Sequence, residues 1–194
     1  MAEVSLMNDL KREIVRFSKL MYEKGYIVAS DGNMSARVDV DRYLITPSGK
    51  RKGELKEEEI LLINNHGTVI EGTLKPSIEI WMHIWIYETR PDVNAVVHGH
   101  PPYATAFSFH MPREYEPLVP EIKEYLGPFG FVPYRAPGSR ELAELVREKC
   151  SDHNVLILHK HGVVTLGESL EDAFNRLERL EFEIKIRSLR GTFH

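Results

Sequence analysis

The chain has 194 residues, of which 42% are hydrophobic and 28% are charged, and its formal net charge is −4. These values are typical of a folded globular protein, and the length suits one domain rather than two. Acidic and basic residues are interspersed without a large basic cluster, and no apolar run is long enough to cross a bilayer. We therefore expect neither nucleic acid nor a membrane as a partner.

The cellular location is predicted from features that the sequence lacks. The N-terminal residues mix charged and apolar positions and contain no apolar block of the kind found in a signal peptide. Cys150 is the only cysteine, so no disulfide can form within the chain. Both observations favour a cytoplasmic protein.

The first half of the chain predicts two helices and several short strands. Apolar residues recur at helical spacing from 6 to 24, and Gly25 is suited to end that helix. Pro76 and Ser77 are predicted to begin the second helix, which extends to residue 89, with Ser77 as its cap. Short β-prone runs between turn-forming residues predict strands at 26–29, 34–38, 43–46 and 61–64.

The second half alternates more regularly between strands and helices. Apolar runs predict strands at 94–98, 131–134, 155–159 and 163–166. Helices are predicted at 101–109, at 140–149 after a Ser139 cap, and in a long final segment after Ser169, whereas 110–129 is irregular. The sum is an α/β fold in a single domain, with a central, mostly antiparallel sheet flanked by helices.

Histidines follow two of these apolar strands. His98 and His100 lie at the end of one, and His159 and His161 lie at the end of another. Because residues i and i+2 of a strand point to the same face, each pair can direct two imidazoles to one point. A catalytic zinc takes three protein ligands and keeps one position open. The spacing alone does not separate such ligands from ordinary histidines at strand ends.

The predicted helix over 76–89 carries a second candidate group. Glu79 and His83 are four residues apart and share one face of that helix. Apolar neighbours such as Trp81 and Met82 would keep the carboxylate away from bulk water, which suits a general acid or base. The alternative is an ordinary Glu–His pair on an exposed helix surface, which would show the same spacing.

Two turn segments and one serine have the composition of an anion site. Residues 30–33 (SDGN) and 46–50 (TPSGK) combine hydroxyl groups with backbone N–H groups, which can form a small cradle for an anion. Ser77 adds a donor at a predicted helix N-terminus, where the helix dipole favours negative charge. Each segment taken alone is also an ordinary turn.

Taken together and in this order, these segments resemble the class II aldolase and adducin family. The resemblance extends from residue 8 to residue 185. It is carried by SDGNMSAR (30–37), ITPSGK (45–50), KPSIEIWMH (75–83), RPDVNAVVHGHP (90–101), APGSRELAE (136–144) and LILHKHGVVTLG (156–167). The resemblance implies that residues 1–194 form one class II aldolase-like domain.

The resemblance also implies roles for individual residues. His98, His100 and His161 match the family's zinc ligands, with His159 as a neighbour of the third. Glu79 matches the catalytic glutamate, which can also touch the metal when no substrate is bound. The positions that hold the substrate phosphate are matched by Gly32, Asn33, Ser48, Gly49 and Ser77.

The activity implied is the zinc-dependent cleavage of a ketose 1-phosphate, such as L-fuculose 1-phosphate, to dihydroxyacetone phosphate and an aldehyde. In this reaction zinc stabilises an enediolate, Glu79 moves the proton at the reacting carbon, and the phosphate orients the ketone. Family members are typically homotetramers with active sites between subunits, so an oligomer is expected.

The resemblance leaves several points open. Ile78 stands where some relatives carry a second serine, which removes one phosphate donor. The proton donor to the leaving group is Glu121, Tyr125 or a residue of a neighbouring subunit. Two other enzyme classes share the fold: L-ribulose-5-phosphate 4-epimerases, which usually carry aspartate at the Glu79 position, and methylthioribulose-1-phosphate dehydratases. The head domain of adducin shares it too, as an interaction module without catalysis. Loss of the metal ligands would indicate such a module.

Overall fold

The computed structural model describes residues 2–110, 112 and 115–191. Its strands are β1 (Asn33–Arg37), β2 (Arg42–Ile45), β3 (Leu61–Asn64), β4 (Val69–Glu71), β5 (Ala95–Gly99), β6 (Phe129–Val132), β7 (Val155–Leu158) and β8 (Gly162–Gly167). Its helices are α1 (Ala2–Glu23), α2 (Ile80–Thr89), α3 (Pro102–Phe107), α4 (Pro120–Leu126), α5 (Arg140–Cys150) and α6 (Leu170–Arg190), with short 3-10 turns η1 (Lys52–Glu54) and η2 (Glu57–Glu59).

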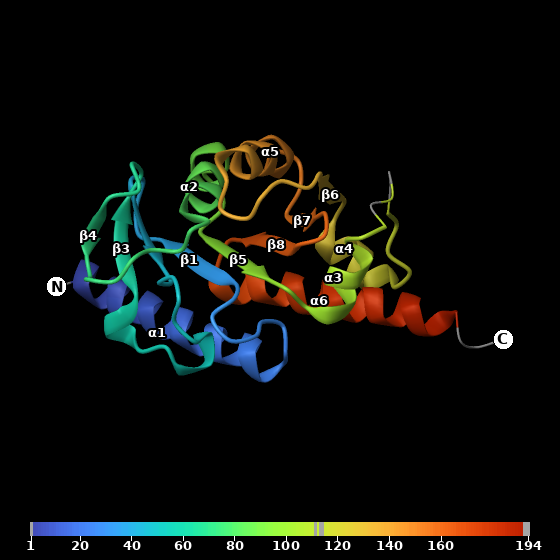
Figure 1. Cartoon of the computed structure of the whole chain (residues 1–194), viewed down its shortest axis with the longest axis horizontal. Helices are drawn as coiled ribbons and strands as arrows, with labels where there is room; N and C mark the ends of the chain where they lie inside the picture. Colours follow the sequence, from blue (N-terminus) through green and yellow to red (C-terminus); the bar gives the residue numbers. More distant parts are fainter. Residues whose placement is uncertain (1, 111, 113–114, 192–194) are drawn as a thin grey trace.

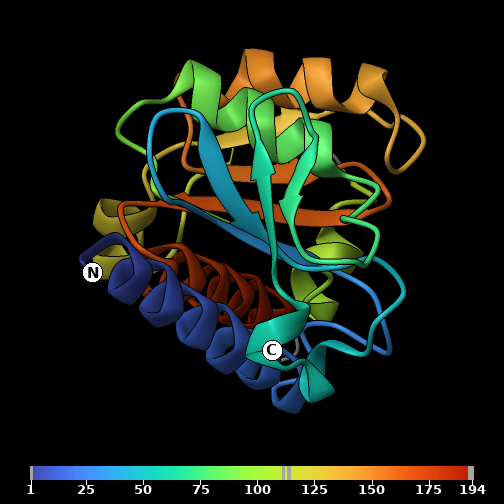
Figure 2. The same cartoon turned by 90° about the vertical axis from the view of Figure 1, so that its left-hand side faces the viewer.

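The strands form one sheet in the order β4-β3-β2-β1-β5-β8-β7-β6. Every neighbouring pair is antiparallel except β6 and β7, which are parallel. Helices α2 and α5 cover one face of the sheet, and α1 and α6 lie side by side on the other (Figure 1; Figure 2). The predicted α/β fold with a mostly antiparallel central sheet is therefore confirmed.

Alternating side chains divide the core into two layers. Along β5, Ala95 and Val97 face the α1–α6 side, whereas Val96 faces the α2–α5 side. Because successive residues of a strand point to opposite faces, this alternation determines where the polar residues of the same strands point. His98 therefore shares the α2–α5 face with Val96, and Ser35 of β1 shares it too.

Two serine caps confirm the predicted starts of the last two long helices. Ser139 accepts a hydrogen bond from the N–H of Leu142, and Ser169 accepts one from the N–H of Asp172. These bonds satisfy backbone donors that have no partner within the first turn of a helix.

The second predicted helix starts later than the sequence indicates. Its first residue is Ile80 and Glu79 occupies the cap position, two residues after the predicted cap. The Ser77 side chain still accepts a backbone hydrogen bond at this end, from the N–H of Glu79 at 3.3 Å. Pro76 forms an isolated bridge with Pro47, and Ser77 N–H donates to the carbonyl of Thr46. These contacts hold the segment alongside the chain that follows β2, so the helix begins only after it leaves that contact.

Other predictions differ from the structure near turns. Residues 26–29 form no strand, because Gly25 and Ala29 both have positive φ angles, of 71° and 47°, which bend the segment. The irregular stretch 110–129 contains α4, and β4 and the two 3-10 turns were not predicted. The strand predicted at 131–134 is β6, displaced by two residues.

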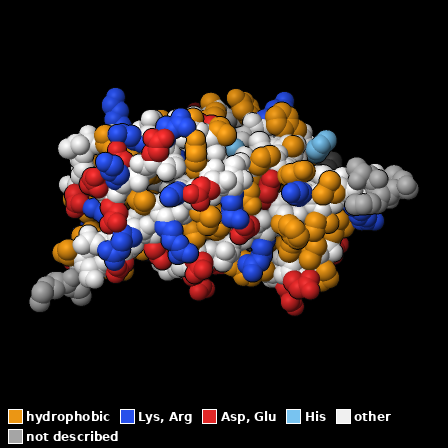
Figure 3. All heavy atoms as spheres, turned by 90° about the horizontal axis from the view of Figure 1, so that it is seen from below, with side chains coloured by type: hydrophobic (Ala, Val, Ile, Leu, Met, Phe, Trp, Pro, Cys, Tyr) orange, Lys and Arg blue, Asp and Glu red, His pale blue; other side chains and the backbone are white. Residues whose placement is uncertain are grey.

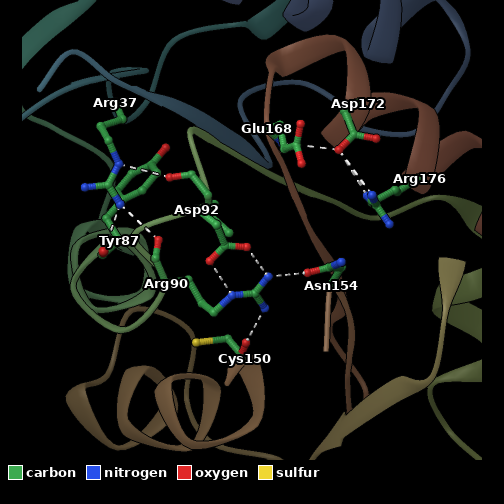
Figure 4. A network of polar contacts seen from close by, with 10 residues as sticks. Arg37, Tyr87, Arg90, Asp92, Cys150, Asn154, Glu168, Asp172 and Arg176 are labelled. Carbon is green, nitrogen blue, oxygen red and sulfur yellow. Dashed lines mark hydrogen bonds and ion pairs between the residues drawn. The ribbon is translucent and has the colours of Figure 1, made fainter. Parts of the chain in front are cut away.

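A polar network joins the ends of α2, α5 and β7. The Arg90 guanidinium donates to both carboxylate oxygens of Asp92, to Asn154 Oδ1 and to the carbonyl of Cys150 (Figure 4). It lies beside the start of β5, whereas the histidines lie at the end of that strand. This network therefore fixes the helices on the sheet at the end of β5 opposite the histidines.

The surface beneath α1 and α6 carries interspersed positive and negative side chains, with hydrophobic side chains gathered over α6 (Figure 3). Phe182 and Leu189 of α6 are 54% and 42% exposed. Among the described residues, no helix is long and apolar enough to span a bilayer.

Candidate active site

The pairing of β5 with β8 brings three histidines together. Gly99 is paired with Val163, so the end of β5 adjoins the start of β8. His98 and His100 from β5 and its extension therefore meet His161, which immediately precedes β8. One nitrogen from each ring lies within 4.8 Å of one from each of the other two. This separation allows the three imidazoles to share one metal ion.

The hydrogen bonds and burial of His98 prepare it as a neutral ligand. Its Nδ1–H donates to the carbonyl of Val163 at 2.9 Å, which leaves Nε2 without a hydrogen. Burial lowers the pKa of His98 well below its usual value, and the neighbouring His161 and His100 lower it further. Burial, followed by His161, also lowers the pKa of His100. Metal ions bind imidazole in this neutral form.

Glu79 joins the three histidines in one cluster of metal-ligating side chains. Its Oε2 is 3.1 Å from His98 Nε2, and its Oε1 is 3.7 Å from His161 Nε2. The side chain is 5% exposed, and Oε1 has no hydrogen-bond partner among the described residues. The bare His98 nitrogen also lies 3.3 Å from His100 Nε2, which can donate to it. A carboxylate oxygen and a bare imidazole nitrogen 3.1 Å apart in a buried site are stabilised by a cation between them, so the residues present fit a metal ion.

Unusual backbone conformations flank this cluster. Ala29 and Lys160, with φ of 47° and 57°, are the only described non-glycine residues with positive φ, and each lies just before a site segment. Gly32 has φ of 68°, and a β-carbon there would lie 2.8 Å from the carbonyl oxygen of His98. The site therefore depends on tight turns, of the kind often found where local strain serves function.

A pocket of about 430 Å³ opens over the histidines. Its other walls come from 30–33, from 47–49 and from Ser77 and Ile78, so the predicted anion segments and the metal-type cluster share one cavity. A cavity of this size suits a small phosphorylated metabolite. Ile78 is 63% exposed and contributes an apolar rim where a second serine would have offered a hydroxyl.

Two backbone N–H groups that the sequence suggested for anion binding already have partners within the protein. The N–H of Ser48 already donates to the carbonyl of Lys75, and the N–H of Ser77 to that of Thr46, so these two serines offer hydroxyl groups but no free N–H. The side-chain amide of Asn33 donates to Glu79 Oε2 at 2.8 Å. Asn33 therefore contacts the candidate catalytic carboxylate as well as the anion pocket.

Lys52 is a pocket residue that the sequence did not reveal. Its ammonium donates to the carbonyls of Ser30, Lys50 and Pro47 at 2.8, 3.1 and 3.3 Å, and so joins the two turn segments. Only 2% of the residue is exposed, and burial lowers its pKa to about 8. The only sequence signal was its place in the Lys50-Arg51-Lys52 run, in which nothing distinguishes one basic residue from the next.

Three other candidates lie outside the pocket formed by this chain. His159 lies next to the trio but does not join it, as the ligand assignment from the resemblance implies. Tyr125 donates to Asp172, whose carboxylate accepts from Glu168 N–H and Arg176 at the far end of β8 (Figure 4). Glu121 is exposed and does not line the pocket.

Comparisons with known proteins agree with this geometry. The family model for the class II aldolase and adducin N-terminal domain matches residues 12–187. An L-fuculose phosphate aldolase from Methanococcus vannielii is 42% identical over 185 residues, which cover 95% of this chain and 98% of that protein. A 3-oxo-tetronate 4-phosphate decarboxylase from Haemophilus influenzae is 34% identical over 186 residues, covering 93% and 88%. The crystal structure of YgbL from Escherichia coli superposes with a TM-score of 0.92 at 30% identity, covering 97% and 93%.

Proposed function

The chain belongs to the class II aldolase and adducin family, and we propose that it is a zinc-dependent aldolase that cleaves a ketose 1-phosphate to dihydroxyacetone phosphate and an aldehyde. The observation that carries this proposal is the shared cavity: the histidine trio and Glu79 line one part of it, and the hydroxyl-rich turns with Lys52 line another. Such a cavity can hold the ketone end and the phosphate end of one small substrate.

In this proposal His98, His100 and His161 hold the zinc ion, and Glu79 contacts it when no substrate is bound. The cation would supply Lewis-acid stabilisation of the negative charge that develops on the ketone oxygen as the carbon–carbon bond breaks. The orphaned Oε1 of Glu79 and the bare Nε2 of His98 support a cation at this point rather than an empty polar cavity.

The remaining residues bind the phosphate and move a proton. The hydroxyls of Ser48 and Ser77, with the backbone at Gly32 and Gly49, hold the phosphate, and Asn33 bridges between it and the catalytic carboxylate. Fixing the phosphate places the scissile bond beside Glu79 without adding groups to the reacting centre. As the bond breaks, the hydroxyl of the departing carbon loses its proton to become the aldehyde. Glu79, once it carries a proton, gives it to the carbon left behind, and both transfers run backwards in the reverse reaction.

Decarboxylation of a 3-oxo-tetronate 4-phosphate is a second candidate, because the Haemophilus influenzae relative carries that name. Loss of carbon dioxide beside a ketone leaves a carbanion of the same kind as aldol cleavage does, so the same residues would serve both reactions. The 42% identity to an L-fuculose phosphate aldolase favours the aldolase.

The other family activities are supported less well. Glu79 stands where the epimerase branch usually carries aspartate, and an interaction module like the adducin head domain has no need of a complete histidine trio. Elimination of water from a methylthioribulose 1-phosphate is a further alternative, and the product assay described below distinguishes it from cleavage.

A cytoplasmic homotetramer is part of the proposal. The exposed Phe182 and Leu189 of α6 favour contact with another subunit, since hydrophobic side chains gather on that face (Figure 3). Because neither Glu121 nor Tyr125 lines this chain's pocket, a residue of a neighbouring subunit is favoured as the group that takes the hydroxyl proton as the aldehyde forms and donates it to the aldehyde oxygen in the reverse reaction.

The test is a product assay with a panel of phosphorylated sugars. The zinc-loaded protein is expected to release dihydroxyacetone phosphate from at least one ketose 1-phosphate, detected with a coupled dehydrogenase. Release of carbon dioxide from a 3-oxo-tetronate 4-phosphate without such cleavage would favour the second candidate. Epimerised pentulose 5-phosphate or a dehydrated product alone would instead contradict both.

A further inference from the structure

Five polar side chains form an unbroken chain between β1 and α2. Glu79, Asn33, His83, Ser35 and Tyr87 follow one another in space, and each is at most 7% exposed. We call these five residues the buried polar chain. It begins at the candidate active site and ends between the sheet and the last turn of α2.

Regular geometry explains why the five residues interleave. Asn33 and Ser35 are two residues apart on a strand, a rise of about 7 Å, and His83 and Tyr87 are four residues apart on a helix, a rise of about 6 Å. These similar repeats let each strand residue lie between two residues of α2. Glu79, at the cap of α2, takes the place at the active-site end.

The contacts between neighbours are short. Asn33 Nδ2 donates to Glu79 Oε2 at 2.8 Å, and Asn33 Oδ1 lies 2.5 Å from His83 Nε2. His83 Nδ1 lies 2.6 Å from Ser35 Oγ, which in turn lies 2.7 Å from the hydroxyl of Tyr87. Each of the four junctions is therefore a hydrogen bond.

One carboxylate determines the position of every hydrogen in this chain. Glu79 Oε2 accepts, so Asn33 must turn its nitrogen toward Glu79 and its oxygen toward His83. An amide oxygen only accepts, so His83 must carry its hydrogen on Nε2. Burial lowers the pKa of His83 to about 3, which keeps the ring neutral and leaves Nδ1 bare. Ser35 then donates to Nδ1 and accepts from Tyr87.

The far end of the buried polar chain is itself held in place. The Arg37 guanidinium donates to the carbonyl of Tyr87 at 2.8 Å and lies 4.9 Å from the centre of its ring (Figure 4). The ring of Tyr87 also stacks on that of Tyr43, with centroids 4.6 Å apart. The position of the Tyr87 hydroxyl oxygen is therefore fixed at the end of the buried polar chain.

We propose that His83 is a positioning residue whose Nε2–H fixes the amide of Asn33 in the one orientation that donates to Glu79. Without that donor the Asn33 oxygen is buried and unsatisfied, so the amide shifts to find another donor and no longer holds the Glu79 carboxylate in place. The inference rests on the proposed role of Glu79 in proton transfer, because it concerns the placement of that carboxylate.

Two amide substitutions separate this role from a merely structural one. In His83→Gln the side-chain nitrogen reaches the place of Nε2 and can still donate to Asn33. In His83→Asn the shorter side chain reaches the place of Nδ1, so it keeps Ser35 and loses Asn33. Because a misplaced catalytic group commonly costs about a hundredfold, His83→Asn is expected to lower kcat by ten- to a hundredfold. His83→Gln is expected to keep kcat within about fivefold of the wild type, and the zinc content of both variants should change little.

Neutron diffraction from deuterated wild-type crystals gives a readout that needs no turnover and no variant. The expected map has a deuteron on Nε2 of His83, none on Nδ1, and the Asn33 nitrogen facing Glu79. A deuteron on Nδ1 alone, or equal kcat for His83→Gln and His83→Asn, would overturn the proposal. If the wild type cleaves no sugar phosphate, the proposed function fails, while the neutron map still decides the position of this hydrogen.

Discussion

Replacing Lys52 by methionine is expected to weaken the binding of phosphorylated ligands while leaving the metal site intact. Methionine keeps the length and apolar character of the side chain but removes the charge. In the structure Lys52 is 2% exposed, its ammonium contacts backbone carbonyls, and no carboxylate lies within ion-pair distance of it among the described residues. Asp31 of the same pocket offsets this burial only in part, and a bound phosphate would provide further negative charge.

The pKa of Lys52 gives the size of the expected loss in phosphate affinity. Burial lowers it from 10.5 to about 8, and at roughly 1.4 kcal/mol per pKa unit the charged form costs the folded protein about 3 kcal/mol. This cost is fully present below pH 8 and disappears as pH rises toward 10.5, because the unfolded chain holds the extra proton in that interval. A phosphate that offsets the cost gains about 3 kcal/mol, roughly a hundredfold in Kd.

The assay measures Kd for inorganic phosphate and KM for the sugar phosphate in the wild type, Lys52→Met and Arg51→Met. Arg51 is the matched control, because it is a basic neighbour that contacts Tyr22 and Glu54 on the surface. Lys52→Met should raise both constants by ten- to a hundredfold, and in the wild type KM should rise as pH increases above 8. Constants within twofold of the wild type for Lys52→Met, or a KM independent of pH from 7 to 9.5, would refute the reasoning.

The remaining predictions concern the histidines, Glu79 and one glycine. Glu79→Gln should bind zinc yet lose at least a hundredfold in kcat, since a general acid–base group contributes about a hundredfold to ten-thousandfold to the rate. Near-normal turnover would show that Glu79 does not transfer the proton. His161→Ala should lose most of its zinc by elemental analysis, whereas His159→Ala should keep it, and the reverse result would exchange their roles. Gly32→Ala should lower both thermal stability and turnover, because its β-carbon would lie 2.8 Å from the carbonyl oxygen of His98; an unchanged melting temperature would show that the turn relaxes easily.

The arrangement of the fold was largely predictable, because strand alternation and helix caps are local signals. Ser139 and Ser169 mark the starts of their helices by hydrogen bonds within the first turn, which a sequence expresses directly. The start of α2 was not predictable in this way. It depends on the bridge between Pro47 and Pro76, a contact between segments that are far apart in the chain.

The same distinction applies to the site. The two histidine pairs were visible in the sequence, but the strand register, which pairs Gly99 with Val163, is what brings His161 to His98 and His100. The contact between Asn33 and Glu79 depends on how β1 and α2 pack together, so the sequence suggested for Asn33 only a place near the phosphate.

The central claim, zinc-dependent cleavage of a ketose 1-phosphate, is tested most directly by removing and restoring the metal. The protein is stripped with a chelator, and the rate of dihydroxyacetone phosphate release is followed as zinc is added back. We expect no cleavage by the stripped protein and full activity at about one zinc per chain, bound by three histidines. Undiminished cleavage by protein free of metal, or activity that zinc does not restore while the protein stays folded, would contradict it.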